Sequence, residues 1–248
     1  KKVLKCQISN SKNLKSLIFL GYLPPVNTLR KIGSNPEEEI YFPAELLYCE
    51  KSKLAQLGCI VDKEILFPYS YPYTSSTTKI LKNNFANLYK DTLKKIDLKK
   101  NDLIIDIGSN DGNLLSNFQS KHRVLGVTPE KIGKLAIKKG IPTIIDYFND
   151  KTVKKILKKN GKAKIITATN VFAHIDDINN IVKNIIKTLD SDGIFISESH
   201  YLLPLIKTVQ YDTIYHEHLR YYSVQSLNFL FKKHNLEIID TKEIGTHG

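Results

Sequence analysis

The 248-residue sequence contains no methionine, even at its first position, and only three cysteines. Cys6, Cys49 and Cys59 are too few to form the disulfide framework of a small secreted domain. No apolar run reaches the length of a membrane span, and no signal peptide opens the chain. We therefore expect a cytoplasmic protein that does not enter a membrane.

Arginine is equally scarce, although the formal net charge is +12. It occurs only at Arg30, Arg123 and Arg220, and lysines scattered along the whole chain supply the rest of the positive charge. A nucleic-acid-binding protein usually gathers its basic residues on one face or along one helix. The scatter therefore argues against a nucleic-acid partner.

A strand, a glycine turn and a helix are predicted where the sequence reads D-L-I-I-D-I-G-S-N-D-G-N-L-L, from Asp102 to Leu115. Residues 103–107 are apolar and largely β-branched, as in a buried parallel strand. The turn lacks the glycine spacing of dinucleotide binders, and no G-K-[ST] follows. A strand that ends in Asp-x-Gly with a second acid in the turn resembles the S-adenosylmethionine site of class I methyltransferases. That resemblance implies cofactor contacts from Asp106, Gly108, Ser109, Asn110 and Asp111, with the two acids facing the cationic amino-acid end.

From residue 100 onward, predicted strands alternate with predicted helices, which indicates a parallel sheet covered on both faces. Ligands bind such sheets at the carboxyl ends of the strands. Asp146 after the third strand and Asn170-Val171 after the fourth are therefore further candidate cofactor contacts. The expected strands are 103–107, 124–127, 143–145, 164–168, 194–198 and 236–240, and the expected helices are 113–120, 130–139, 150–159, 178–189 and 223–234.

Residues 1–78 carry many turn signals, such as Pro24-Pro25 and Gly33-Ser-Asn-Pro36, and little helical periodicity. We interpret this part as a small, irregular module of strands and loops. Residues 79–99 repeat apolar side chains at helical spacing and predict a connecting helix. Residues 100–248 then form the domain with the parallel sheet.

Tyr215-His216-Glu217-His218 brings two imidazoles, a carboxylate and a phenol together within four positions. Imidazole gains and loses a proton near neutral pH, and a carboxylate or phenol can orient it or stabilise its charge. The pattern predicts proton-transfer chemistry. A surface histidine cluster or a pair of metal ligands is the alternative.

Six distinctive strings follow one another along the chain: L-P-P-V-N at Leu23–Asn27, F-P-Y-S-Y-P-Y-T-S-S at Phe67–Ser76, D-I-G-S-N-D-G at Asp106–Gly112, A-T-N-V-F-A-H-I at Ala168–Ile175, Y-H-E-H at Tyr215–His218 and T-H-G at Thr246–Gly248. With these strings the sequence resembles, from Lys5 to the last residue, the sugar C-methyltransferases that act on nucleotide-linked 4-keto-deoxysugars. The resemblance implies an α/β fold: a Rossmann-like class I methyltransferase sheet preceded by a small zinc-ribbon-like module.

The resemblance implies a mechanism and roles. A ketone at sugar C4 acidifies the proton on C3, a base removes that proton, and the enolate attacks the sulfonium methyl group. By motif position His218 is the base, and Tyr215, Glu217 and Tyr73 assist by orienting it, bonding the ketone or contacting the sugar. We interpret His216 as structural.

The metal site of the N-terminal module departs from the family pattern of two C-x-x-C pairs. Here the pairs read Cys6-Gln-Ile-Ser9 and Cys49-Glu-Lys-Ser52. Zinc in structural sites needs four ligands, and serine hydroxyls are poor replacements for thiolates at neutral pH. We therefore expect no tightly bound zinc. The methyl transfer itself needs no metal.

Two further departures concern the cofactor and the end of the chain. Thr128 stands where a carboxylate commonly holds the ribose hydroxyls, and we expect it to make one hydrogen bond to the cofactor there. Glu130, two residues on, either lies near that contact or begins the next helix, where an acid is favoured. The chain stops at T-H-G, before the antiparallel strand that class I sheets insert internally. We expect a fragment whose sheet is completed by a missing C-terminal segment or a partner chain. His174 either faces the pocket or is a satisfied polar residue.

The leading hypothesis is an S-adenosylmethionine-dependent C-methyltransferase that deprotonates a carbon next to a ketone of a nucleotide-linked deoxysugar. The first alternative is a degenerate or split subunit that binds the cofactor or a partner without turnover. The second alternative, an RNA methyltransferase, rests on the positive charge alone.

Overall fold

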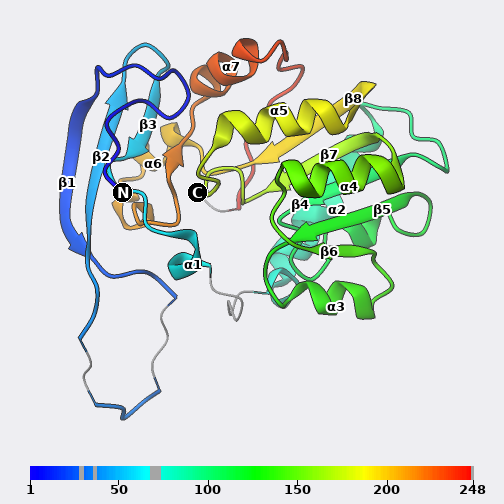
Figure 1. Cartoon of the computed structure of the whole chain (residues 1–248), viewed down its shortest axis with the longest axis horizontal. Coiled ribbons are helices and arrows are strands. Elements are labelled where there is room, and N and C mark those ends of the chain that lie inside the picture. Colours follow the sequence, from blue (N-terminus) through cyan, green and yellow to red (C-terminus); the bar gives the residue numbers. More distant parts are fainter. Residues whose placement is uncertain (28–30, 36–37, 68–73, 247–248) are drawn as a thin grey trace.

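Two sheets form the framework of the computed structural model, which describes residues 1–27, 31–35, 38–67 and 74–246 (Figure 1). One is antiparallel with strand order β1-β2-β3-β9, and the other is parallel with order β6-β5-β4-β7-β8. The strands are β1 (Lys15–Leu23), β2 (Phe42–Cys49), β3 (Leu54–Leu57), β4 (Leu103–Ile107), β5 (Arg123–Thr128), β6 (Thr143–Ile145), β7 (Ala163–Thr169), β8 (Leu189–Glu198) and β9 (Arg220–Tyr221).

Four of the described helices begin at a side chain that caps them. Thr78, Asn149, Asp177 and Ser223 each accept a backbone N–H of the first turn of α2, α4, α5 and α7, and such caps stabilise a helix by about 1 kcal/mol. The helices are α1 (Lys63–Leu66), α2 (Lys79–Leu93), α3 (Gly133–Lys138), α4 (Asp150–Asn160), α5 (Ile178–Thr188), α6 (Leu202–Lys207) and α7 (Val224–Lys233), and the 3-10 turns are η1 (Ser75–Thr77), η2 (Leu115–Asn117) and η3 (Tyr211–Thr213).

β4 lies at the centre of the parallel sheet and is apolar on both faces. Leu103 and Ile105 pack into the core shared with α4 and α5, whereas Ile104 packs into the opposite core with α2 and η2. Alternate residues of a strand point to opposite faces, so a strand covered on both sides is mainly apolar. This explains the apolar run 103–105, and the strand ends in Asp106 and Ile107 at the edge where ligands bind.

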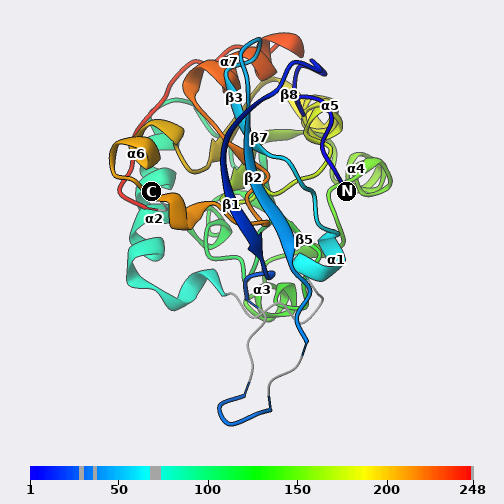
Figure 2. The ribbon, with the colours of Figure 1, turned by 90° about the vertical axis from the view of Figure 1, so that its left-hand side faces the viewer.

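The antiparallel sheet is joined to the rest of the chain through β9. Gln56 and Ala55 of β3 pair with Arg220 and Tyr221, the residues that follow the Y-H-E-H segment. Arg220 is fully buried, and its guanidinium donates to the carbonyl oxygen of Asp176 at 2.6 Å. Figure 2 looks onto β1 and β2 in front of the remaining structure. The Y-H-E-H segment is therefore held between the two sheets.

The predicted parallel sheet is confirmed, with residues 103–107 and 143–145 forming strands over the expected ranges. The predicted helix 113–120 is wrong, because only the 3-10 turn η2 forms there. The Ser116 hydroxyl and the Asn117 amide both donate to the Asn113 carbonyl oxygen. Such short polar side chains compete with the backbone for the bonds that would extend a helix.

The predicted strand 236–240 is also wrong, because these residues form no strand. Leu236 and Ile238 pack against the core that contains α5 and α7, and Asp240 forms an ion pair with Lys95 at 3.2 Å. Side-chain contacts therefore hold this segment in place of backbone pairing. Among the described residues, β8 pairs only with β7 and forms one edge of the sheet.

The boundaries 1–78, 79–99 and 100–248 remain a prediction, although α2 occupies most of the expected connecting helix. No helix in the described part of the chain combines the length and the apolar character needed to cross a membrane.

Candidate functional site

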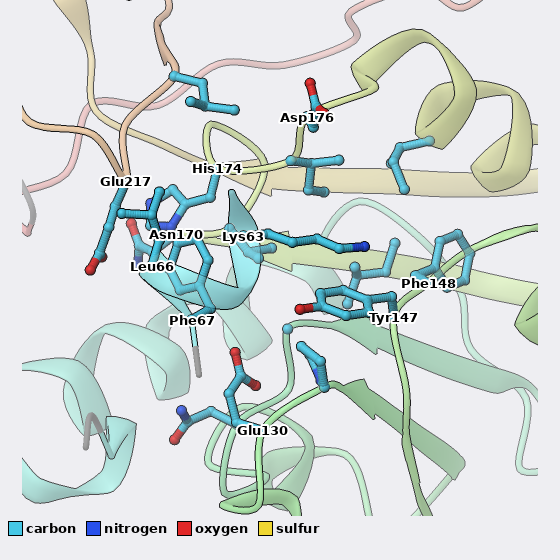
Figure 3. Close-up of a pocket in the computed structure, with 18 of the residues that line it drawn as sticks. Lys63, Leu66, Phe67, Glu130, Tyr147, Phe148, Asn170, His174, Asp176 and Glu217 are labelled. Carbon is cyan, nitrogen blue, oxygen red and sulfur yellow. The ribbon is translucent and has the colours of Figure 1, made fainter. Parts of the chain in front are cut away.

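A cavity of about 860 Å³ opens at the carboxyl ends of β4, β5 and β7, where parallel sheets bind ligands. Both modules line this cavity: the N-terminal module contributes α1 and the loop after β1, and the parallel-sheet domain contributes the loops that follow its strands. Figure 3 shows Glu217 and Asn170 toward one end, and Tyr147 and Phe148 toward the other. An elongated ligand can therefore contact both groups.

The turn after β4 brings backbone close to the opposite wall. Gly108 has φ +74, and a Cβ atom there would lie only 2.8 Å from a methyl carbon of Val171. Gly108 also donates its backbone N–H to Val127 at 2.8 Å. Only glycine meets both conditions without strain. Gly108, Ser109, Asn110, Val171 and Asp106 all line the cavity, as the sequence predicts for a shared site.

Asp106 is a buried acid on the cavity wall, with 2% of its surface exposed. The Thr167 hydroxyl donates to its Oδ1 atom at 2.6 Å. Burial raises the pKa of Asp106 to about 7, and the hydrogen bond from Thr167 opposes that rise. The group therefore changes charge near neutral pH and suits a cationic ligand, which would favour its ionised form.

Asp111 lies beneath the same turn and does not line the cavity. It is fully buried, accepts a hydrogen bond from the Ser75 hydroxyl at 2.6 Å, and pairs with Lys139 at 2.8 Å. Burial acts to raise the pKa of Asp111, but these two partners hold the pKa below its usual value. The geometry makes Asp111 a brace between the turn and its neighbours, while Asn110, which accepts from the Ser75 backbone, faces the cavity.

The loops after β5 and β6 form the far end of the cavity. Thr128 is buried and donates to Glu130, and Glu130 reaches the cavity in its place. Asp146 accepts the backbone N–H of Tyr147 and likewise lies behind the wall, whereas the Tyr147 side chain lines it. Lys63 Nζ lies 3.9 Å from the centre of the Tyr147 ring, a cation–π distance. Sequence reasoning missed Tyr147 and Lys63, because no motif marks either residue.

Asn170 lines the cavity just after β7, in the left-handed region at φ +55. Its amide donates to Glu198 Oε1 at 2.9 Å, and the Asn84 amide donates to Glu198 Oε2 at 2.8 Å. Glu198, at the end of β8, therefore fixes the orientation of Asn170. Only the position of Glu198 at a strand end could have suggested this role.

Tyr215 and His218 form a hydrogen-bonded pair in the cavity. The His218 Nδ1 atom lies 2.9 Å from the Thr213 carbonyl oxygen, which can only accept, so Nδ1 carries the hydrogen. The Nε2 atom is then the acceptor of the neutral ring, and it lies 3.0 Å from the Tyr215 hydroxyl. This arrangement can move a proton from the phenol to the imidazole.

Two more imidazoles surround His218. The ring centre of His174 lies 5.1 Å from that of His218, and the ring of His200 lies 4.1 Å away. Phe67 stacks on His174 from the N-terminal module. His174 therefore faces the pocket, the first of its two predicted alternatives. His200 was missed, because a lone histidine after a strand carries no pattern.

The other members of the Y-H-E-H segment point to different places. Glu217 is 2% exposed, lines the cavity, and accepts a hydrogen bond from Asn27 at 2.9 Å. His216 lies outside the cavity lining, and its Nε2 atom is 3.2 Å from the Pro43 carbonyl oxygen. Burial lowers the pKa of His216, so the ring is neutral and fits the predicted structural role. Tyr73 lies outside the described residues.

The four residues at the family's zinc-ligand positions do come together. Cys6 Sγ lies 3.1 Å from the Ser52 hydroxyl, and Cys49 Sγ lies 3.5 Å from the Ser9 hydroxyl. Burial acts to raise the pKa of Cys49, but hydrogen bonds from Ser52 and Ser9 lower it to about 7. Within the described ranges, no group of three or more histidine, cysteine or acidic side chains is arranged to hold a metal ion. Two thiols and two hydroxyls do not fit zinc, and its absence remains a prediction.

Comparison with known proteins adds two family matches. A family described as "Methyltransferase domain" matches residues 80–241, and one described as "Putative zinc binding domain" matches residues 6–67. The chain is 30% identical over 246 residues to the C-methyltransferase NovU of Streptomyces niveus, which covers 98% of this chain. The chain spans 58% of the length of that relative.

Solved structures with a similar fold are more distant in sequence. A S-adenosylmethionine-dependent methyltransferase from Clostridium acetobutylicum is 18% identical with a TM-score of 0.43, over 54% of this chain and 55% of that one. The YcgJ protein of Bacillus subtilis is 19% identical with a TM-score of 0.48, over 61% of this chain and 67% of that one.

Proposed function

Because the chain belongs to the methyltransferase-domain family, we propose that it methylates a carbon next to a ketone of a nucleotide-linked deoxysugar. S-Adenosylmethionine, the cofactor of this domain, supplies an electrophilic methyl group when it is bound. The observation that carries the proposal is the Tyr215–His218 pair, which lies in the same cavity as the turn after β4. A carbon acid needs a base, and a metal-free base of this kind suits enolate formation.

In this proposal the residues at the carboxyl ends of β4 and β5 would hold the cofactor. Asp106 would hold its ammonium group, and the Gly108–Asn110 backbone would hold the methionine portion. Asn170, fixed by Glu198, closes that end. Glu130 takes over the ribose contact expected of Thr128, and Tyr147 provides an aromatic surface for adenine. Asp111 and Asp146 support these residues from behind the wall.

The Tyr215–His218 pair removes the proton next to the ketone. The Tyr215 oxygen accepts the proton from carbon while its own proton passes to His218 Nε2. The Thr213 carbonyl holds the ring through Nδ1–H and keeps Nε2 available as the acceptor. His218 then carries the positive charge, which the Glu217 carboxylate in the same cavity stabilises. His218 is thus the base, and Tyr215 relays the proton to it.

The test measures removal of the sugar proton separately from methyl transfer. We expect the sugar C3 proton to exchange into deuterated water in the presence of S-adenosylhomocysteine, which has no methyl group to transfer. His218→Asn and Tyr215→Phe should each slow this exchange by about two to four orders of magnitude. His216→Asn is the matched control, since His216 belongs to the same segment but lies outside the cavity. Exchange at the wild-type rate in His218→Asn would place the base elsewhere.

The nucleotide-linked sugar remains part of the proposal, as does the cytoplasmic location expected from the sequence. The name of NovU includes C-methylation, which supports carbon as the acceptor atom. A split subunit without turnover would bind S-adenosylhomocysteine but show no exchange, so the same experiment separates that alternative.

A further inference from the structure

Asn27, the last residue of the L-P-P-V-N string, contacts the cavity from the N-terminal module. Its Nδ2–H donates to Glu217 Oε1 at 2.9 Å, across 190 positions of sequence. Asn27 is exposed at the cavity wall, whereas Glu217 is only 2% exposed. A surface residue of one module therefore reaches a buried carboxylate of the other.

The local sequence aims this side chain. β1 ends at Leu23, and Pro24-Pro25 cannot continue its pairing because proline has no backbone N–H. Asn27 then adopts φ +64, in the left-handed region that asparagine tolerates better than most side chains. A non-glycine residue in this region is strained and is often found at functional sites. The turn directs the Asn27 amide onto Glu217.

The chemistry of the contact suits a buried carboxylate that has to be held in one orientation. A buried carboxylate is unfavourable unless hydrogen bonds compensate for its lost water, and bonds to an ionised group are stronger than those between neutral groups. An amide supplies such a bond without adding a charge of its own. The Asn27 amide donates this hydrogen bond from outside the parallel-sheet domain. A chain without the loop after β1 would therefore lack the donor to Glu217.

We propose that Asn27 is a positioning residue, whose amide holds the Glu217 carboxylate in the orientation that the reaction in the cavity requires. The inference rests on the proposed function for its catalytic part. It gives the N-terminal module a role in turnover that is separate from metal binding. The competing interpretation is that the contact merely docks the module onto the domain.

Asn27→Asp tests the contact with Glu217, with Asn10→Asp as the matched control, and the kcat of Asn27→Gly separates the two interpretations. Asn10 also has positive φ, at 61, and is exposed in the same module, but it does not line the cavity. In Asn27→Asp a second carboxyl faces Glu217, and the like charge raises the pKa of the new carboxyl above its unfolded value. The stability that the protonated carboxyl contributes to Asn27→Asp is then fully present below about pH 4 and is lost as pH rises through the raised pKa.

The first measurement is the thermal unfolding midpoint of both variants and the wild type between about pH 4 and pH 8. We expect the unfolding midpoint of Asn27→Asp to fall further below that of the wild type as pH rises. The difference in midpoint between Asn10→Asp and the wild type should stay constant. Equal deficits at every pH would overturn the proposal. This measurement needs no substrate, so it stands even if the proposed function fails.

The second measurement is methyl transfer. Asn27→Gly, which relieves the backbone strain but removes the amide, should lower kcat about ten-fold at every pH. The activity of Asn27→Asp relative to the wild type should rise toward acid pH, where its protonated carboxyl again donates to Glu217. Asn10→Gly should match the wild type. Full kcat in Asn27→Gly would overturn the catalytic role, whereas an inactive wild type would instead reject the proposed function.

Discussion

Replacing Asp106 by asparagine should stabilise the protein at neutral pH. Burial raises the pKa of Asp106 to about 7, whereas an aspartate in an unfolded chain titrates near 3.9. The folded state therefore holds this proton more tightly than the unfolded state does. The stability linked to the proton is complete below about pH 4 and is lost as pH rises to about 7.

The magnitude follows from the difference of about three pKa units. At 1.36 kcal/mol for each unit, the wild type loses on the order of 4 kcal/mol between about pH 4 and pH 7. Relaxation of the buried site makes this an upper estimate. Asparagine keeps an acceptor for the Thr167 hydroxyl, which lies 2.6 Å from Asp106 Oδ1, and never ionises. The free energy of unfolding of Asp106→Asn should therefore not decrease with pH in this way.

Urea unfolding at about pH 4 and about pH 7.5 measures the effect. We expect the free energy of unfolding of Asp106→Asn to exceed that of the wild type at the higher pH only. Asp111→Asn is the matched control from the same turn, with the opposite sign. Its partners lower the pKa of Asp111, so replacing it should destabilise the protein at both pH values, because its contribution to stability is lost only as pH falls below about 4 toward the folded pKa. A pH-independent difference for Asp106→Asn would refute the reasoning.

The remaining predictions concern binding, metal and chemistry. Gly108→Ala should weaken S-adenosylhomocysteine binding in calorimetry, because φ +74 and the close opposite wall leave no room for a Cβ atom; unchanged affinity would argue against a cofactor at this turn. The purified wild type should contain no stoichiometric zinc by elemental analysis. The double variant Ser9→Cys/Ser52→Cys restores four thiols and should gain one zinc per chain. Tightly held zinc in the wild type would contradict this prediction. His218→Asn should lower methyl transfer by about two to four orders of magnitude with little change in cofactor affinity, and His216→Asn should do less damage to the rate.

The strand ends, and with them half of the cavity, could be predicted from the sequence. Residues 103–105 are apolar on both faces because β4 is covered on both faces, and this pattern is local. Parallel strands bring their carboxyl ends to one edge of the sheet, so Asp106 and Asn170 line the same cavity although they are far apart in sequence. The Tyr215–His218 contact spans three positions and is equally local.

Contacts between the two modules could not be predicted in this way. The bond between Asn27 and Glu217 depends on a turn whose direction no periodicity encodes. The motif predicts Asp111 as a cofactor contact, but its side chain instead binds Ser75 and Lys139, which lie on other segments of the chain. The sequence shows which side chains are polar, but only packing decides which of two neighbouring acids faces the cavity.

The most direct test of the account follows the methyl group itself. The protein is incubated with S-adenosylmethionine labelled with carbon-13 in its methyl group and with a nucleotide-linked 4-keto-deoxysugar, and the product is examined by NMR. We predict a labelled methyl group coupled to a sugar carbon next to the ketone, formed by the wild type and lost in His218→Asn. A labelled methyl group on oxygen or nitrogen, or the same product from His218→Asn, would contradict the account.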